Sequence, residues 1–160
     1  MFHIILFSPQ IPPNTGNIIR LSANVGAALH LIEPLGFRLN EKSCRRAGLD
    51  YHALTNLNLH KNLDDCIASL DTARLFAITS RGTVSVFESQ FAPGDAFLFG
   101  SETTGLPDAV HAGFGESQKL RLPMIAGNRS LNLGNAASIV VYEACRQTGF
   151  AFARKDLKFV

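Results

Sequence analysis

The sequence lacks tryptophan and has only three cysteines among its 160 residues. Cys44, Cys66 and Cys145 are odd in number and far apart, so they match neither a disulfide framework nor a zinc-binding spacing and favour a reducing cytoplasm. Net charge is also small, at +2, while 46% of the residues are hydrophobic, a combination that excludes an intrinsically disordered chain. The 13 glycines and 7 prolines exclude collagen-like or low-complexity character.

Long hydrophobic runs are absent as well. No apolar stretch approaches the roughly 18 residues of a membrane span, so we expect a protein that is not embedded in a membrane. The apolar N-terminus has no basic region before it and is cut short by Pro9, Pro12 and Pro13, which argues against a secretory signal. We therefore expect a cytoplasmic protein. The isoelectric point near 8.6 permits a nucleic-acid partner without indicating one.

Short apolar runs alternate with helical patterns along the chain, and this alternation predicts an α/β domain with a mostly parallel sheet flanked by helices. Residues 1–150 form one expected domain, and residues 151–160 form a polar, basic C-terminal tail. The expected strands are Phe2–Phe7, Leu29–Ile32, Leu75–Thr79, Ala96–Phe99 and Leu120–Leu122. The expected helices run from a cap at Asn14 or Thr15 to about Asn24, over Asp64–Leu70, over Asp108–Ala112, and from Asn132 to about Gln147.

The segment Ile11–Arg20 leads from the first strand into the first helix. Two prolines stiffen its entry, and Asn14 places an amide group at a helix N-terminus, which favours anionic groups. Arg20 follows Asn14 by six residues, and we expect it on the same side of the helix. An ordinary capped surface helix with a solvated arginine explains the same spacing.

The segment Phe97–Pro107 joins an apolar strand to a loop between Gly100 and Gly105, at the edge where open α/β sheets bind ligands. It is not a phosphate-binding loop, because Leu106 replaces the essential lysine and Glu102 would repel a phosphate. A neutral or cationic ligand suits it better. A tight turn in which Glu102 caps a helix is the structural alternative.

The segment Leu122–Ser138 contains a polar loop followed by a helix rich in small residues. Gly134 and its small neighbours allow close backbone approach, either for packing or beside a ligand. The five histidines, by contrast, have no pair at helical spacing, so we expect no metal site. They are His3, His30, His52, His60 and His111.

Together these three segments resemble the three motifs of the SPOUT methyltransferases, in the SpoU subgroup. Ile11–Arg20 resembles the first motif, Gly100–Pro107 the second and Leu122–Ser138 the third. Including Asn24–Pro34 and Arg45–Tyr51, the resemblance covers about residues 1–150 and is to the YibK/TrmL-like branch of minimal, single-domain tRNA 2′-O-methyltransferases.

The resemblance implies a C-terminal deep trefoil knot, a homodimer with an active site completed across the interface, and S-adenosylmethionine as cofactor. It also implies methylation of the wobble nucleotide 34, cytidine or a modified uridine, in leucine tRNAs, through contact with the anticodon loop. The residues that match the cofactor-binding positions or neighbour them are Ile78, Thr79, Gly100, Leu122, Met124, Ser130 and Leu131.

In the subgroup, an arginine that matches Arg20 is placed at the reacting hydroxyl. A guanidinium is a poor general base, so we expect Arg20 to clamp the substrate phosphate and 2′-oxygen. We expect Asn14, Glu102 and Asn132 to orient Arg20 and to shape the loops. The sulfonium donor is already activated, so the reaction needs no metal. The candidates for RNA contact are Arg129, Tyr142, Arg154 and Lys155. Two alternatives remain: the same chemistry on ribosomal RNA, or a non-catalytic module that binds RNA or a nucleotide.

Overall fold

The computed structural model describes residues 1–38, 56–70, 74–128 and 130–153. Its strands form one seven-stranded sheet with the order β3-β2-β1-β6-β4-β7-β5, and every pairing is parallel. The α/β class and the parallel sheet are therefore confirmed. The strands are β1 (His3–Phe7), β2 (Ala28–Ile32), β3 (Leu57–His60), β4 (Leu75–Ile78), β5 (Val84–Ser85), β6 (Ala96–Phe99) and β7 (Lys119–Arg121).

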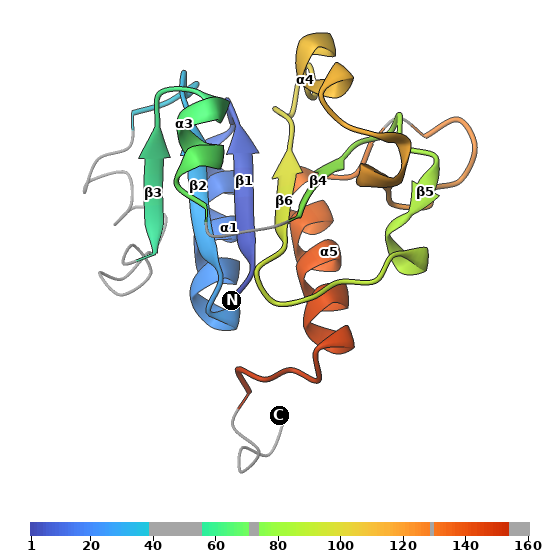
Figure 1. The fold of residues 1–160 in the computed structure, drawn as a ribbon. Helices are drawn as coiled ribbons and strands as arrows, with labels where there is room; N and C mark the ends of the chain where they lie inside the picture. Colours follow the sequence, from blue (N-terminus) through green and yellow to red (C-terminus); the bar gives the residue numbers. More distant parts are fainter. Residues whose placement is uncertain (39–55, 71–73, 129, 154–160) are drawn as a thin grey trace.

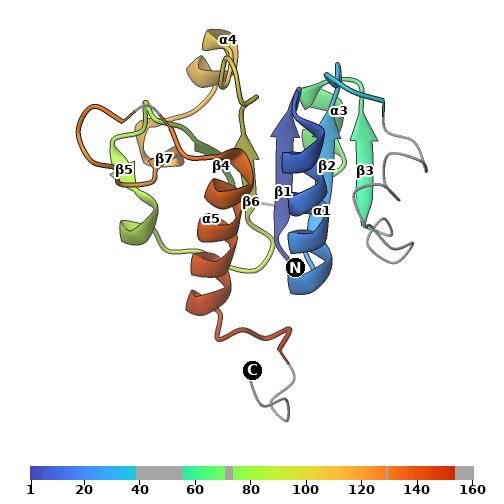
Figure 2. The ribbon, with the colours of Figure 1, turned by 180° about the vertical axis from the view of Figure 1, so that it is seen from behind.

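Helices cover both faces of the sheet. The helix α3 lies over β1 and β2 on the face seen in Figure 1, and α1 and α5 pack side by side on the opposite face, which Figure 2 shows. No helix in the described ranges is long and apolar enough to cross a membrane. The helices are α1 (Pro12–Val25), α3 (Leu63–Ala68), α4 (Asp108–Ala112) and α5 (Leu133–Gln147), with short 3₁₀ turns at Val86–Glu88 and Glu116–Gln118.

Two apolar cores follow from the alternation of strand side chains. Ile4, Leu6 and their neighbours face α1 and α5, while Ile5 and its neighbours face α3 and α4. The central strands β2 and β6 are buried along their whole length, as a parallel sheet covered on both faces requires.

The expected start of α1 is wrong. The helix begins at Pro12, with Ile11 as the residue before its first turn, so Asn14 and Thr15 lie inside the helix and do not cap it. Proline suits this position because its missing N–H would have had no partner in the first turn. The far end is set by Gly26, which adopts a left-handed conformation with φ of 67° and donates its N–H to Ser22.

The other boundaries differ less from those expected. The helix expected over Asp64–Leu70 runs from Leu63 to Ala68, because the Asn62 side chain caps it by accepting from the Asp65 N–H. Asn132 caps α5 in the same way, by accepting from the Asn135 N–H. The strands β3 and β5 were not expected; β3 is a partly exposed edge strand and β5 has two residues.

Candidate active site

A cavity of about 370 Å³ opens where the carboxyl ends of β4 and β6 meet the start of α5. This is the sheet edge at which open α/β folds bind ligands. All seven residues proposed from the sequence to bind the cofactor line this one cavity, although they come from three segments. They are Ile78, Thr79, Gly100, Leu122, Met124, Ser130 and Leu131.

Gly100 occupies a position that only glycine fits. A Cβ atom there would lie 2.2 Å from the backbone carbon of Gly105. The loop folds back on itself, because Ser101 and Gly105 exchange two backbone hydrogen bonds, with N–O distances of 3.2 and 3.0 Å. Gly105 has φ of 69°, a left-handed conformation that glycine adopts readily. The two glycines thus shape a compact wall of the cavity.

Glu102 joins this loop to the start of α1. Its carboxylate accepts hydrogen bonds from the backbone N–H of Gln10 at 2.8 Å and of Ile11 at 3.2 Å, and from Asn14 Nδ2 at 3.0 Å. Burial raises the pKa of Glu102, but these hydrogen bonds stabilise the charged form and the net effect lowers the pKa. The carboxylate is therefore ionised at neutral pH, and it ties the loop after β6 to the residues that lead into α1 and to the Asn14 side chain.

Asn14 and Asn132 complete the connection to α5. Asn132 Nδ2 donates to Asn14 Oδ1 over 2.8 Å, across 118 positions of sequence. The chain Glu102–Asn14–Asn132 therefore holds together the loop after β6, the first turn of α1 and the first turn of α5. All three side chains also line the cavity. The role of these residues in shaping the loops stays a prediction, and this network is the contact through which they would do so.

Arg20 is placed differently from what its spacing suggested. Asn14 is buried and Arg20 is exposed, and Arg20 does not line the cavity of its own chain. Six residues at about 100° each place the two side chains roughly 120° apart around α1. The expectation that they share a side of the helix is therefore wrong, whereas the role of Asn14 in orienting Arg20 stays a prediction.

The proposed RNA-contacting residues are only partly described. Tyr142 lies on the exposed side of α5, with its ring centroid 6.5 Å from that of Phe150, and it does not line the cavity. Arg129, Arg154 and Lys155 lie outside the described residues. The cavity also has lining residues that the sequence did not single out, among them Ser80 and Ser101. Each follows a predicted site residue directly in the sequence, and this position is the only sequence signal that could have identified it.

Three of the five histidines lie close together in the fold, although none of them is paired at helical spacing in the sequence. His3, His30 and His60 lie on the adjacent strands β1, β2 and β3 and form a hydrogen-bonded row. Burial, followed by the neighbouring His3 and His60, lowers the pKa of His30 to about 4. Parallel pairing produced this row, which spacing along the sequence cannot show. His111 lies apart on α4, and His52 is outside the described residues.

Comparison with known proteins places this arrangement in a family. The SpoU rRNA Methylase family matches residues 1–142. A tRNA (cytidine(34)-2′-O)-methyltransferase of Burkholderia ambifaria is 55% identical over 152 residues, covering 94% of this chain and 97% of that protein. The enzyme of the same description from Escherichia coli (strain K12) is 48% identical over 150 residues, covering 94% and 96%.

Solved structures agree with these relatives. A structure from work on the 2-OH methylation of C/U34 on tRNA has a TM-score of 0.85 and 43% identity, covering 93% of this chain and 97% of its own. AviRb of Streptomyces viridochromogenes, a SpoU methyltransferase in complex with AdoMet, has a TM-score of 0.77 and 26% identity over 91% of this chain and 57% of its own. With a family match over residues 1–142 and relatives near half identity across almost their whole length, this chain belongs to the SpoU rRNA methylase family.

Proposed function

We propose that this protein transfers a methyl group from S-adenosylmethionine to the ribose 2′-hydroxyl of the wobble nucleotide 34 of tRNA. The observation that carries the proposal is the cavity, in which all seven expected cofactor residues meet the Glu102–Asn14–Asn132 network. The methyltransferases of Burkholderia ambifaria and Escherichia coli act on cytidine 34, and they align with nearly the whole chain. We extend the substrate to cytidine or a modified uridine at this position in leucine tRNAs.

The cavity fits S-adenosylmethionine in size and chemistry. Its volume of about 370 Å³ is within the usual range for small-ligand sites. Ile78, Leu122 and Leu131 offer apolar surface for an adenine ring, Thr79 and Ser130 offer hydroxyl groups, and Met124 adds a flexible wall. The ionised carboxylate of Glu102 suits a cationic ligand. Gly100 has no side chain, so only backbone atoms form the cavity wall at this position. When bound, the cofactor supplies a methyl group already activated on a sulfonium.

The chain's own residues then have to position the ribose hydroxyl. Arg20, as a catalytic residue, clamps the phosphate and the 2′-oxygen of the substrate through its planar guanidinium. In the proposed arrangement Arg20 comes from a second copy of the chain, which fits its absence from the lining of its own chain's cavity. Asn14, Glu102 and Asn132 hold the cavity walls in place. The 2′-hydroxyl proton leaves through the substrate phosphate or water.

The proposal includes the architecture and the setting of the enzyme. We propose a homodimer with composite sites, a C-terminal deep trefoil knot formed by the segments carrying the second and third motifs, and a cytoplasmic location. Residues 1–150 act as the single methyltransferase domain, and residues 151–160 as a basic tail. Arg129, Tyr142, Arg154 and Lys155 are the proposed contacts to the anticodon loop.

Methyl transfer from labelled S-adenosylmethionine to total tRNA and to total ribosomal RNA tests this function. We expect label in leucine tRNA alone, and mass spectrometry of nuclease fragments should place the methyl group on the ribose of nucleotide 34. A leucine tRNA carrying 2′-deoxyribose at that position is the matched control and should accept no label. Label in ribosomal RNA, or cofactor binding without any transfer, would overturn the assignment.

A further inference from the structure

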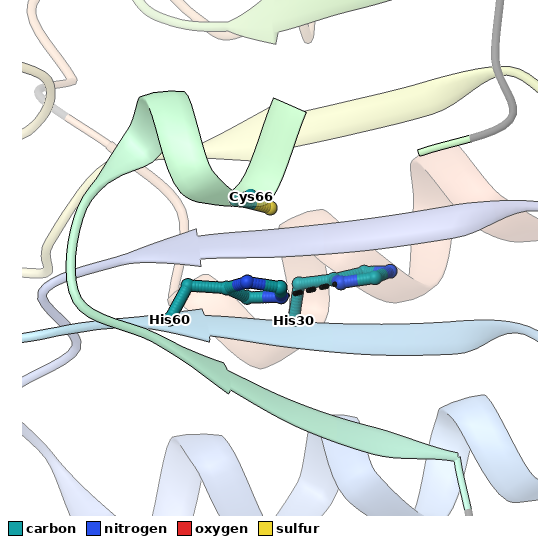
Figure 3. Close-up of side chains that lie close together, drawn as sticks. All are labelled: His30, His60 and Cys66. Carbon is teal, nitrogen blue, oxygen red and sulfur yellow. Dashed lines mark hydrogen bonds between the residues drawn. The ribbon is translucent and has the colours of Figure 1, made fainter. Parts of the chain in front are cut away.

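The row of histidines lies away from the proposed active site and has no role in it. His30 is central in β2, a strand of five residues that are all buried, so its imidazole lies within the apolar interior. His60 follows on β3, and Cys66 on α3 faces both rings, as Figure 3 shows. The methyltransferase cavity lies at β4, β6 and the start of α5 and is lined by none of these three residues.

The three side chains converge closely. His30 Nδ1 and His60 Nε2 are 2.9 Å apart, and one ligand atom from each of His30, His60 and Cys66 lies within 4.8 Å of the other two. His30 Nε2 is 3.1 Å from His3 Nδ1 on the other side. Cys66 is fully buried, whereas His60 is partly exposed at the edge strand. An ion therefore has access from the side of His60.

Two imidazoles and one thiolate are the donors that zinc and related borderline-soft metals take in proteins. We propose that His30, His60 and Cys66 bind a zinc-class transition-metal dication that ties β2 and β3 to α3. Three protein ligands leave a fourth position for water, as in zinc sites that keep one position open. Asp65, in the first turn of α3, interacts electrostatically with His60 and adds negative charge at this side of the site.

Every proton displaced when the metal binds can be accounted for by the side chains of the site and by solvent. Metal binding takes the lone pairs of His30 Nδ1 and His60 Nε2, so the proton between them moves to His60 Nδ1 by a change of tautomer. His30 then keeps its proton on Nε2 and donates it to His3 Nδ1, the usual outer hydrogen bond of a metal-bound histidine. The Cys66 thiol releases its proton to solvent, and no redox change occurs.

Without metal, the spacing of the two nitrogen ligands is close to what a metal needs, and the Cys66 sulfur lies within 4.8 Å of the ligand atom of each histidine. Two nitrogen ligands at the usual zinc distance and a tetrahedral angle are about 3.3 Å apart, a little more than the 2.9 Å seen here. A small rotation of the partly exposed His60 provides the difference. Without metal, the two rings satisfy each other by a hydrogen bond, so the chain folds with no unpaired imidazole nitrogen between them.

Titration of the metal-free, full-length protein with Zn²⁺ and with Co²⁺ tests the proposal. We expect one Zn²⁺ bound per chain by calorimetry, a rise in thermal unfolding temperature, and an intense near-ultraviolet thiolate-to-cobalt band. Cys66→Ala should abolish that band and weaken Zn²⁺ binding at least tenfold, and His60→Ala should weaken Zn²⁺ binding to the same degree. His60 is on a partly exposed edge strand, so His60→Ala should fold even if Cys66→Ala does not.

Matched controls come from the same chain. Cys145→Ala removes a buried cysteine from α5, and His111→Ala removes a buried histidine from α4. Both should bind Zn²⁺ and Co²⁺ like the parent protein. Failure of the parent protein to bind one Zn²⁺ would overturn the proposal. So would stoichiometric binding that persists in His60→Ala, or a cobalt spectrum without the thiolate band.

Discussion

The carboxylate of Glu102 accepts three hydrogen bonds, from the backbone N–H groups of Gln10 and Ile11 and from the Asn14 side chain. Replacing it by glutamine keeps the shape but puts an amide N–H₂ against donors that need an acceptor. We expect Glu102→Gln to lower the free energy of unfolding by about 1–3 kcal/mol at pH 7, measured by urea unfolding. The charged form is favoured in the folded state, so the pKa of Glu102 lies below its ordinary value of 4.5.

The pH dependence of this loss follows from that direction. Stability from Glu102 is fully present above its ordinary pKa and is lost as pH falls through the lowered pKa of the folded state. The difference in unfolding free energy between the parent protein and Glu102→Gln should therefore shrink as pH is lowered below about 4.5. A difference that stays constant from pH 7 to pH 3 would contradict the role of the carboxylate as an ionised acceptor.

Gly100 should shape the cofactor site because it has no side chain. Gly100→Ala places a Cβ 2.2 Å from the Gly105 backbone, so the loop must move and the cavity wall with it. We expect S-adenosylmethionine binding, measured by calorimetry, to weaken at least tenfold. Gly113→Ala is the matched control, because its Cβ would meet nothing closer than 3.4 Å and its φ of −76° suits alanine. Equal affinities in the two variants would show that Gly100 does not shape the cofactor site.

The sequence was enough to name the candidate site residues, but it did not show which of them contact one another. Gly100, Ser130 and their companions were identified through a family resemblance, and one cavity contains them all. The pairing of Asn14 with Asn132 spans 118 positions, and only the packing of α1 on α5 creates it. The three histidines joined in a row for a similar reason, because partners across parallel strands depend on register.

At the scale of elements, the caps of α3 and α5 are alike, but only one touches the site. Asn62 and Asn132 both accept a backbone N–H in the first turn, and Asn132 also donates to Asn14. We expect Asn62→Ala and Asn132→Ala each to cost about 1 kcal/mol of unfolding free energy. Only Asn132→Ala should also reduce methyl transfer, measured with labelled cofactor. An equal loss of activity in both variants would assign the effect to general destabilisation.

Element boundaries show where local sequence signals fail. The strands at β1, β2, β4 and β6 were expected within a residue or two, because largely buried apolar runs are distinctive. β7 was expected one residue off, around its buried Leu120. The edge strand β3 was missed, since half-exposed Leu-Asn-Leu-His has no such run. The start of α1 was misplaced because the helix opens on Pro12 and Pro13, so that Asn14 and Thr15, residue types that often cap helices, lie within its first turn.

At the scale of the whole molecule, tRNA affinity should fall gently with salt. Net charge is only +2, and few cationic side chains are proposed to reach phosphates. A handful of contacts to single-stranded RNA gives a log–log slope of roughly −2 to −4. Filter binding across a salt series measures it, and Arg129→Ala or Lys155→Ala should flatten it by less than one unit. A change in preference for the base at nucleotide 34 would contradict a purely electrostatic role for these residues.

In the proposed dimer, each methyl-transfer site combines the cavity of one chain with Arg20 of the other. Arg20→Ala should lower methyl transfer by a hundred- to a thousandfold, or about 3–4 kcal/mol, and leave S-adenosylmethionine binding nearly intact. Arg20→Lys should restore little, because an ammonium lacks the planar fork. The reason for intact binding is geometric, since Arg20 does not line the cavity of its own chain.

Mixing Arg20→Ala chains with Gly100→Leu chains separates the two contributions. If each site takes its cavity from one chain and Arg20 from the partner, a mixed dimer contains one intact site. Random exchange makes half of the dimers mixed, so about a quarter of the parent activity should return. Mixing Arg20→Ala chains with chains that carry both substitutions is the matched control and should stay inactive. If mixed dimers form and remain as inactive as this control, Arg20 does not act across the interface. In that case the Arg20 and the cavity of a site belong to the same chain, and no dimer in either mixture holds a complete site.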